Sequence, residues 1–171
     1  MFSIKEIIID ENSEFFNKNN MHYYEFNSNI KKIKFYTSQI IQNPFLNGIE
    51  SELLKQQIEE LISNAIIHGN KNDINKKIKI WFSCDSKKAR IIVEDEGQGF
   101  KDIEKWNSFN KKRIKYLSEK NFNKAKHYLS YKSEDSSEMN GGNALFAALE
   151  YWNKGIVFNS KRNIIAALRI F

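Results

Sequence analysis

The sequence predicts a two-layer α/β sandwich of the α+β kind, in which a mixed, mostly antiparallel sheet is covered on one face by about three helices. Apolar and polar residues alternate from Ile78 to Phe82, as in a strand with one buried face. Apolar residues recur at helical spacing from Leu54 to Ile66, as in a helix with a wide buried stripe. Two further strand patterns, 156–159 and 164–171, lie near the end of the chain.

The first elements in chain order are two short strands and a helix. Strands are expected over Phe2 to Ile9 and His22 to Asn27, joined by a polar connection, Glu11 to Asn20, whose pattern defines no structure. A helix is expected over Ile30 to Gln42, and Pro44, the only proline, should end it.

The second helix and a hairpin follow. The helix should run from about Ser51, its predicted N-cap, to Gly69. After a polar loop, 70–75, two strands are expected on either side of a turn at 85–88, and the second should deliver Asp95 at its end.

The remaining elements are helices and a closing strand pair. Helical stretches are expected within 101–132, followed by a polar segment at 133–140. A helix over 143–152 should begin after Gly141-Gly142 and end at Gly155, before the two final strands.

Length and cysteine content indicate one domain over 1–171 in a reducing compartment. Cys84 is the only cysteine, so no intrachain disulfide can form, and we expect it to be a partly buried strand residue. The first residues do not resemble a secretory signal, and no apolar run approaches the length of a membrane span. A cytoplasmic protein without membrane attachment is therefore expected.

The positive charge is concentrated in one segment. The net charge is +6, and residues 101–132 hold ten Lys or Arg against three Asp or Glu. This segment could contact phosphates, an acidic partner or nucleic acid, or it could be a solvated surface. Because its aromatic residues suit packing as well as base stacking, nucleic acid is the least favoured partner.

Three polar residues, Glu60, Asn64 and His68, share one face of the second helix, at the edge of its apolar stripe. Glu60 and Asn64 are one turn apart, so their side chains lie close together. An amide oxygen is a hard metal ligand, and a carboxylate can orient a water or a hydroxyl. Such pairs are also common on solvated helix surfaces.

Two glycine-containing stretches supply further candidates for a binding site. Asp95 could accept a hydrogen bond from an exocyclic amine such as that of adenine, and Gly97 and Gly99 before Phe100 let the backbone approach a ligand. The alternative is an ordinary tight turn. Gly141-Gly142 would place free backbone amides at a helix N-terminus, where phosphates bind.

Together, Ser63-Asn64-Ala65-Ile66-Ile67-His68-Gly69, Asp95-Glu96-Gly97-Gln98-Gly99-Phe100 and Gly141-Gly142 resemble the N, G1 and G2 boxes of the GHKL superfamily of ATPases and kinases. The first box looks most like that of the small anti-sigma-factor serine kinases. The resemblance covers about residues 30–171 and implies a Bergerat-type ATP-binding domain, with 101–140 as an extended ATP lid.

The resemblance implies a role for each matching residue. Asn64 matches a magnesium-coordinating asparagine and Glu60 the general base. Asp95 matches the adenine-binding aspartate, and the remaining nucleotide-binding positions fall on Gly97, Gly99, Phe100, Gly141 and Gly142. The implied cofactors are ATP and Mg²⁺.

The implied activity is transfer of the ATP γ-phosphoryl group to a protein partner, a sigma factor or an anti-sigma antagonist. A homodimer is compatible with the resemblance. The alternative is an ATP-gated binding module without phosphotransfer. Two departures favour that alternative: Ala144 in place of a glycine, and Asn163-Ile164-Ile165 in place of a Gly-Thr pair. The long 101–140 segment is a third departure from the family pattern. A further alternative, the catalytic domain of a sensor histidine kinase, is less favoured because no phosphoacceptor segment precedes the boxes.

Overall fold

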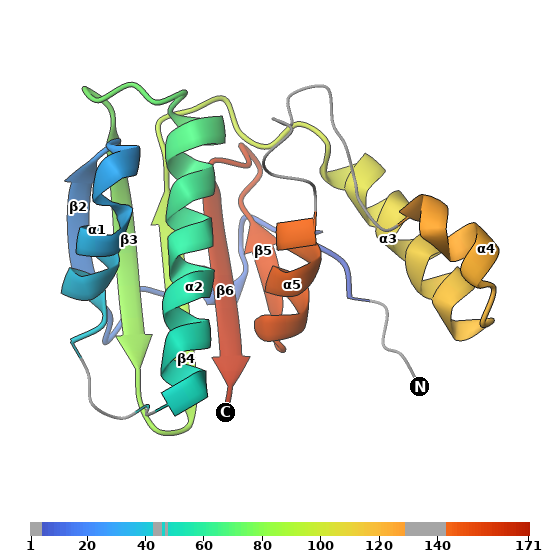
Figure 1. Cartoon of the computed structure of the whole chain (residues 1–171). Coiled ribbons are helices and arrows are strands. Elements are labelled where there is room, and N and C mark those ends of the chain that lie inside the picture. Colours follow the sequence, from blue (N-terminus) through green and yellow to red (C-terminus); the bar gives the residue numbers. More distant parts are fainter. Residues whose placement is uncertain (1–4, 43–45, 47, 129–142) are drawn as a thin grey trace.

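The computed structural model describes residues 5–42, 46, 48–128 and 143–171. Its centre is a six-stranded sheet with the strand order β1-β5-β6-β4-β3-β2. The β1 and β5 strands are parallel, and the other neighbouring strands are antiparallel. Three helices, α1, α2 and α5, lie on one face of this sheet (Figure 1). The predicted α/β sandwich is confirmed.

The β3 strand follows an alternating apolar pattern, whereas β4, β5 and β6 contain continuous apolar runs. Their bounds are β1 (Ile8–Ile9), β2 (His22–Asn27), β3 (Lys77–Cys84), β4 (Lys88–Glu94), β5 (Gly155–Phe158) and β6 (Ile164–Ile170). The strand at 22–27, the hairpin of β3 and β4 and the final pair are confirmed. Gly155 does not end the preceding helix as expected, because that helix stops at Tyr151 and Gly155 opens β5 with φ of +123°.

The helices are α1 (Ile33–Ile40), α2 (Gly48–Asn64), α3 (Ile103–Ser118), α4 (Phe122–Ala125) and α5 (Asn143–Tyr151). Short 3₁₀ turns form at 14–16, 30–32 and 126–128. The prediction that Ser51 caps α2 is wrong, because α2 begins at Gly48 and Ser51 lies inside it. Pro44 and the segment 133–140 lie outside the described residues.

The α2 helix supplies one side of the main core. Its buried side chains pack with the inward-facing residues of β3 and β4. Completely buried members of this layer, each at most 1% exposed, are Leu54, Ile58, Ile62, Ile66, Ile78, Ile80 and Ile91. Burying one such side chain contributes about 1.5–3 kcal/mol, so this contact fixes where the end of α2 lies over the sheet.

The connection between β1 and β2 crosses the face of the sheet opposite the three helices. Lys18 lies over the Trp81 ring, 3.5 Å from its centroid, and Arg90 donates to the backbone oxygen of Asn17. The backbone amide of Ser160 donates to the carboxylate of Glu11 at 2.8 Å. The polar segment at 11–20, whose pattern defined no structure, therefore covers part of the second face of the sheet.

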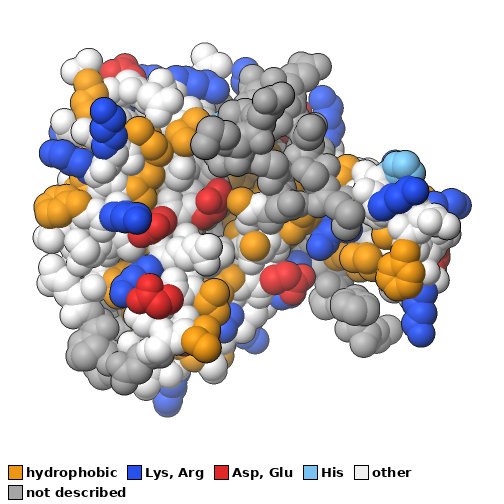
Figure 2. All heavy atoms as spheres, in the orientation of Figure 1, with side chains coloured by type: hydrophobic (Ala, Val, Ile, Leu, Met, Phe, Trp, Pro, Cys, Tyr) orange, Lys and Arg blue, Asp and Glu red, His pale blue; other side chains and the backbone are white. Residues whose placement is uncertain are grey.

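The predominantly basic segment forms an arm beside the sheet. Figure 1 shows α3 and α4 projecting past the β1 edge of the sheet, and Figure 2 shows Lys and Arg side chains over this arm. Trp106 anchors the arm: it is 1% exposed and packs 4.9 Å from the Phe146 ring of α5. Tyr116 and Tyr128 pack on each other with ring centroids 5.4 Å apart.

Candidate functional site

The end of α2 changes from α-helical to π-helical geometry just after Asn64. The π-helical turn η3 covers Ala65–Gly69 and is closed by a hydrogen bond of 2.8 Å from the Asn70 amide to the Ala65 oxygen. Such π turns inside helices are frequent at functional sites. Here the turn lies between the Glu60 and Asn64 pair and the residues that contact Asp95.

Glu60 and Asn64 are brought together as the spacing predicts. The Asn64 amide nitrogen donates to Glu60 Oε1 at 3.3 Å, and both residues are partly buried. An ionised carboxylate only accepts hydrogen bonds, so the nitrogen of the amide must face Glu60. The Asn64 Oδ1 atom is therefore directed away from Glu60 and has the chemistry of a hard metal ligand.

Asp95 follows β4 directly and is packed against the end of the π turn. A methyl group added at Gly69 would lie well inside 3.0 Å of the Asp95 carboxyl carbon, and one added at Gly97 would overlap the backbone oxygen of Gly69. Gly69, Asp95 and Gly97 thus interlock. Both glycines are needed because a side chain at position 69 would overlap the Asp95 carboxylate and one at position 97 would overlap the Gly69 backbone.

The Asp95 carboxylate is held by one of its two oxygens. The Gly97 amide donates to Oδ1 at 2.7 Å, and no residue in the described part of the chain donates to Oδ2. Burial raises the pKa of Asp95 from 3.8 to about 6, while the Gly97 amide and the charge of Lys161 act in the opposite direction. At neutral pH this carboxylate is ionised, poorly solvated and able to accept a hydrogen bond from a ligand.

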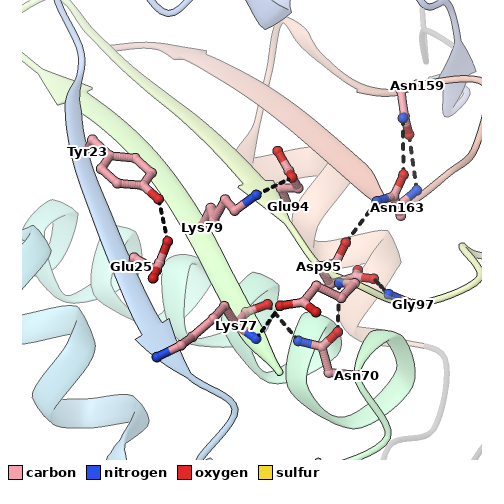
Figure 3. A network of polar contacts seen from close by, with 11 residues as sticks. Tyr23, Glu25, Asn70, Lys77, Lys79, Glu94, Asp95, Gly97, Asn159 and Asn163 are labelled. Carbon is pink, nitrogen blue, oxygen red and sulfur yellow. Dashed lines mark hydrogen bonds and ion pairs between the residues drawn. The ribbon is translucent and has the colours of Figure 1, made fainter. Parts of the chain in front are cut away.

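The backbone of Asp95 is fixed by the turn between β5 and β6. The Asp95 backbone amide donates to the backbone oxygen of Asn163 at 3.0 Å, and the side-chain Nδ2 of Asn163 donates to the backbone oxygen of Asp95 at 2.8 Å. Asn159 in turn accepts from the Asn163 amide at 3.0 Å (Figure 3). Asn163 stands where the resemblance expects a Gly-Thr pair, and in this structure it orients Asp95.

The remaining predicted residues have varied surroundings. Gly99 has φ of +89° and lies so close to the Lys161 oxygen that a side chain would clash there. Phe100 packs against Phe158 of β5, 6.0 Å between ring centroids, so its ring contributes to the core beside the site. Gly141 and Gly142 lie outside the described residues.

One of the sequence departures has a simple structural setting. Ala144 is the second residue of α5 and does not have a positive φ, so this position does not require a glycine for its backbone conformation.

Within the described ranges no group of three or more His, Cys, Asp or Glu side chains is arranged to hold a metal ion.

Sequence reasoning missed Gly69, Asn70 and Asn163 as parts of this site. Gly69 and Asn163 appeared only as a motif end and a departure, and Asn70 only as the start of a polar loop. Only the structure shows that all three contact the turn of residues 95–97.

The helices of the described segments include none that is long and apolar enough to cross a lipid bilayer.

Comparison with known proteins finds partial similarity to one kind of regulator. A stretch of 51 residues, 30% of this chain, is 35% identical to the anti-sigma F factor of Shouchella clausii (strain KSM-K16). The same proportion of the chain is 39% identical to the anti-sigma F factors of Geobacillus stearothermophilus and Geobacillus kaustophilus (strain HTA426).

The match spans 35% of the length of each of these relatives. No protein-family model matches the chain. The partial similarity agrees with the predicted resemblance to anti-sigma factors.

Proposed function

We propose that this protein binds Mg-ATP and transfers the γ-phosphoryl group to a Ser or Thr hydroxyl of a partner protein, in the manner of an anti-sigma-factor kinase. The observation that carries the proposal is the Asp95 carboxylate, which is held by Gly97 and packed against Gly69 while Oδ2 has no donor among the described residues. Such an acceptor complements the exocyclic amine of adenine.

The residues of α2 would act at the phosphate end of the nucleotide. Asn64 Oδ1 would hold Mg²⁺, which would neutralise phosphate charge when bound. Such an ion commonly takes one or two protein ligands together with phosphate oxygens. The hydroxyl oxygen of the partner would attack the γ-phosphorus, the bond to the β-phosphate oxygen would break, and Glu60 would accept the hydroxyl proton.

The partner would be a protein of the sigma-factor or anti-sigma-antagonist kind. The partial similarity to proteins named anti-sigma F factor supports this choice. Exposed lysines on α3 and α4, such as Lys111, Lys115 and Lys124, would favour an acidic surface on that partner. The same chain in two copies, as a homodimer, is compatible with this proposal.

A titration with ATP and magnesium tests the nucleotide part of the proposal. Wild type is expected to bind, and Asp95→Asn to bind at least tenfold more weakly, because an amide presents an N–H group where the adenine amine donates. Isothermal titration calorimetry at one salt concentration measures both. Absence of ATP binding by folded wild type would overturn the proposal.

A second variant separates phosphotransfer from binding. Glu60→Gln is expected to retain ATP binding and lose transfer to the partner by about 10²–10⁴-fold, the usual contribution of a general base. The alternative function is an ATP-gated binding module, which the Asn163 departure favours. It predicts partner capture that depends on ATP and yields no phosphorylated partner in wild type.

A further inference from the structure

Asn70 is a polar loop residue that is completely buried. It follows the π turn, is 0% exposed, and uses every polar group of its side chain. Its Oδ1 accepts from the Glu96 amide at 2.7 Å, and Nδ2 donates to Ser28 Oγ and to the Lys77 oxygen at 2.8 Å each. A buried amide that is fully hydrogen-bonded holds its neighbours in one geometry, since each bond is directional.

The contacts of Asn70 join the two halves of the candidate site. Its backbone amide closes the π turn that follows Asn64, and its side chain holds Glu96, the residue after Asp95. Asn163 holds the backbone of Asp95 from the opposite side (Figure 3). The turn of residues 95–97 is therefore fixed between two asparagines that belong to different elements.

We propose that Asn70 is a positioning residue that sets the placement of the Asp95 turn relative to the end of α2, and so the distance between the adenine side and the magnesium side of the site. The second half of this inference rests on the proposed function. An apolar side chain at position 70 could fill the same space, but it would leave the Glu96 amide and the Lys77 oxygen without their partner.

Amide hydrogen exchange of the ligand-free full chain, followed by NMR, tests the positioning role without any nucleotide. Asn70→Ala is expected to speed exchange of the Glu96 amide about tenfold relative to the slowest amides of β4, because one direct hydrogen bond is lost. Ser28→Ala is the matched control. It removes another partner of Asn70 in the same buried cluster, and it leaves the bond to Glu96 intact.

A third variant separates positioning from a general loss of stability. Asn70→Asp keeps an oxygen that accepts from Glu96, but it buries a charge and loses the donor to Lys77. We expect Asn70→Asp to unfold at lower urea concentration than Asn70→Ala, yet to protect the Glu96 amide better. If Asn70 only stabilised the fold, the variant that unfolds at lower urea concentration would also show the faster exchange of the Glu96 amide.

Nucleotide affinity completes the test. Asn70→Ala is expected to weaken ATP binding about tenfold or more under conditions where it remains folded, and Ser28→Ala to weaken it less than threefold. Unchanged Glu96 exchange in Asn70→Ala, or faster exchange with unchanged ATP affinity, would overturn the inference. If wild type binds no ATP, the proposed function fails, and the exchange rates alone still support or overturn the role of Asn70 in holding the turn.

Discussion

Replacing Asp95 by Asn is expected to stabilise the fold above about pH 6 while it removes the proposed adenine contact. Burial raises the pKa of this carboxyl from 3.8 to about 6 in the folded chain, so ionising it costs free energy that the unfolded chain does not lose. A shift of about 2 units corresponds to about 3 kcal/mol at about 1.4 kcal/mol per unit. Because the side chain is only partly buried, we expect about 1–2 kcal/mol.

The expected gain in stability of the Asp95→Asn variant depends on pH. At about pH 3.5 and below the carboxyl is mostly protonated in both the folded and the unfolded chain, so the gain from the substitution should be small there. Between about pH 4 and pH 6 the folded chain binds the extra proton, and wild-type stability falls as pH rises. The Asp95→Asn variant lacks this titration, so its gain should grow across that interval and then remain constant.

Urea unfolding of wild type and Asp95→Asn, at about pH 3.5 and about pH 7, measures the effect. The substitution keeps the volume of the side chain and an oxygen that can accept from the Gly97 amide, so the local hydrogen bond is retained. A variant that is less stable than wild type at neutral pH would refute the reasoning. An equal difference between the two proteins at both pH values would also refute it.

Three further predictions follow from the packing and the charge of the site. Gly69→Ala should displace the Asp95 carboxylate, cost about 2–3 kcal/mol of unfolding free energy and abolish ATP binding. Gly48 has open space around it but φ of +63°, so the control Gly48→Ala should cost only about 1 kcal/mol. Urea unfolding and calorimetry measure both variants. Trp106→Ala should cost about 3–5 kcal/mol because this ring is 1% exposed, and Phe122→Ala, at a ring 68% exposed, should stay within about 0.5 kcal/mol in the same unfolding assay. Adenosine, which carries no titrating phosphate, should bind more weakly as pH falls through about 6, because a protonated Asp95 is a weaker hydrogen-bond acceptor. NMR titration at several pH values measures this affinity, and a constant affinity would contradict the prediction.

The fold could be predicted from the sequence wherever one face of an element is buried. Alternation predicts β3, because a slip of one residue would expose its apolar side chains, and β2 and β4 are predicted as short runs of strand-forming residues. The start of α2 could not be placed, since Ser51 is a good cap by residue type but the helix begins at Gly48, and Glu50 in its first turn accepts a hydrogen bond from Arg169 of β6. The parallel pairing of β1 with β5 has no local signal.

Residues of the candidate site could be proposed from their chemistry, but the contacts that hold them could not. Asp95, Gly97 and the pair of Glu60 and Asn64 were candidates because such groups can contact a ligand or a metal, although tight turns and solvated helix surfaces use the same residues. Asn70 does not stand out, because a buried asparagine in a loop has the same sequence pattern as a solvated one. Its role depends on contacts with residues 26 and 42 positions away.

The order of the strands has a consequence for synthesis of the chain on the ribosome. The backbone of Asp95 is held by Asn163, 68 residues later, and β1 (Ile8–Ile9) pairs with β5 (Gly155–Phe158), far along the chain. Contacts at such long sequence separation form late, because the loop between them must close first. A nascent chain that stops before Asn163 thus contains every residue of the N and G1 boxes and still lacks the two hydrogen bonds that hold the backbone of Asp95. Under the proposed function, ATP would favour chains in which β6 has joined the sheet, and it would stabilise the domain from that point on.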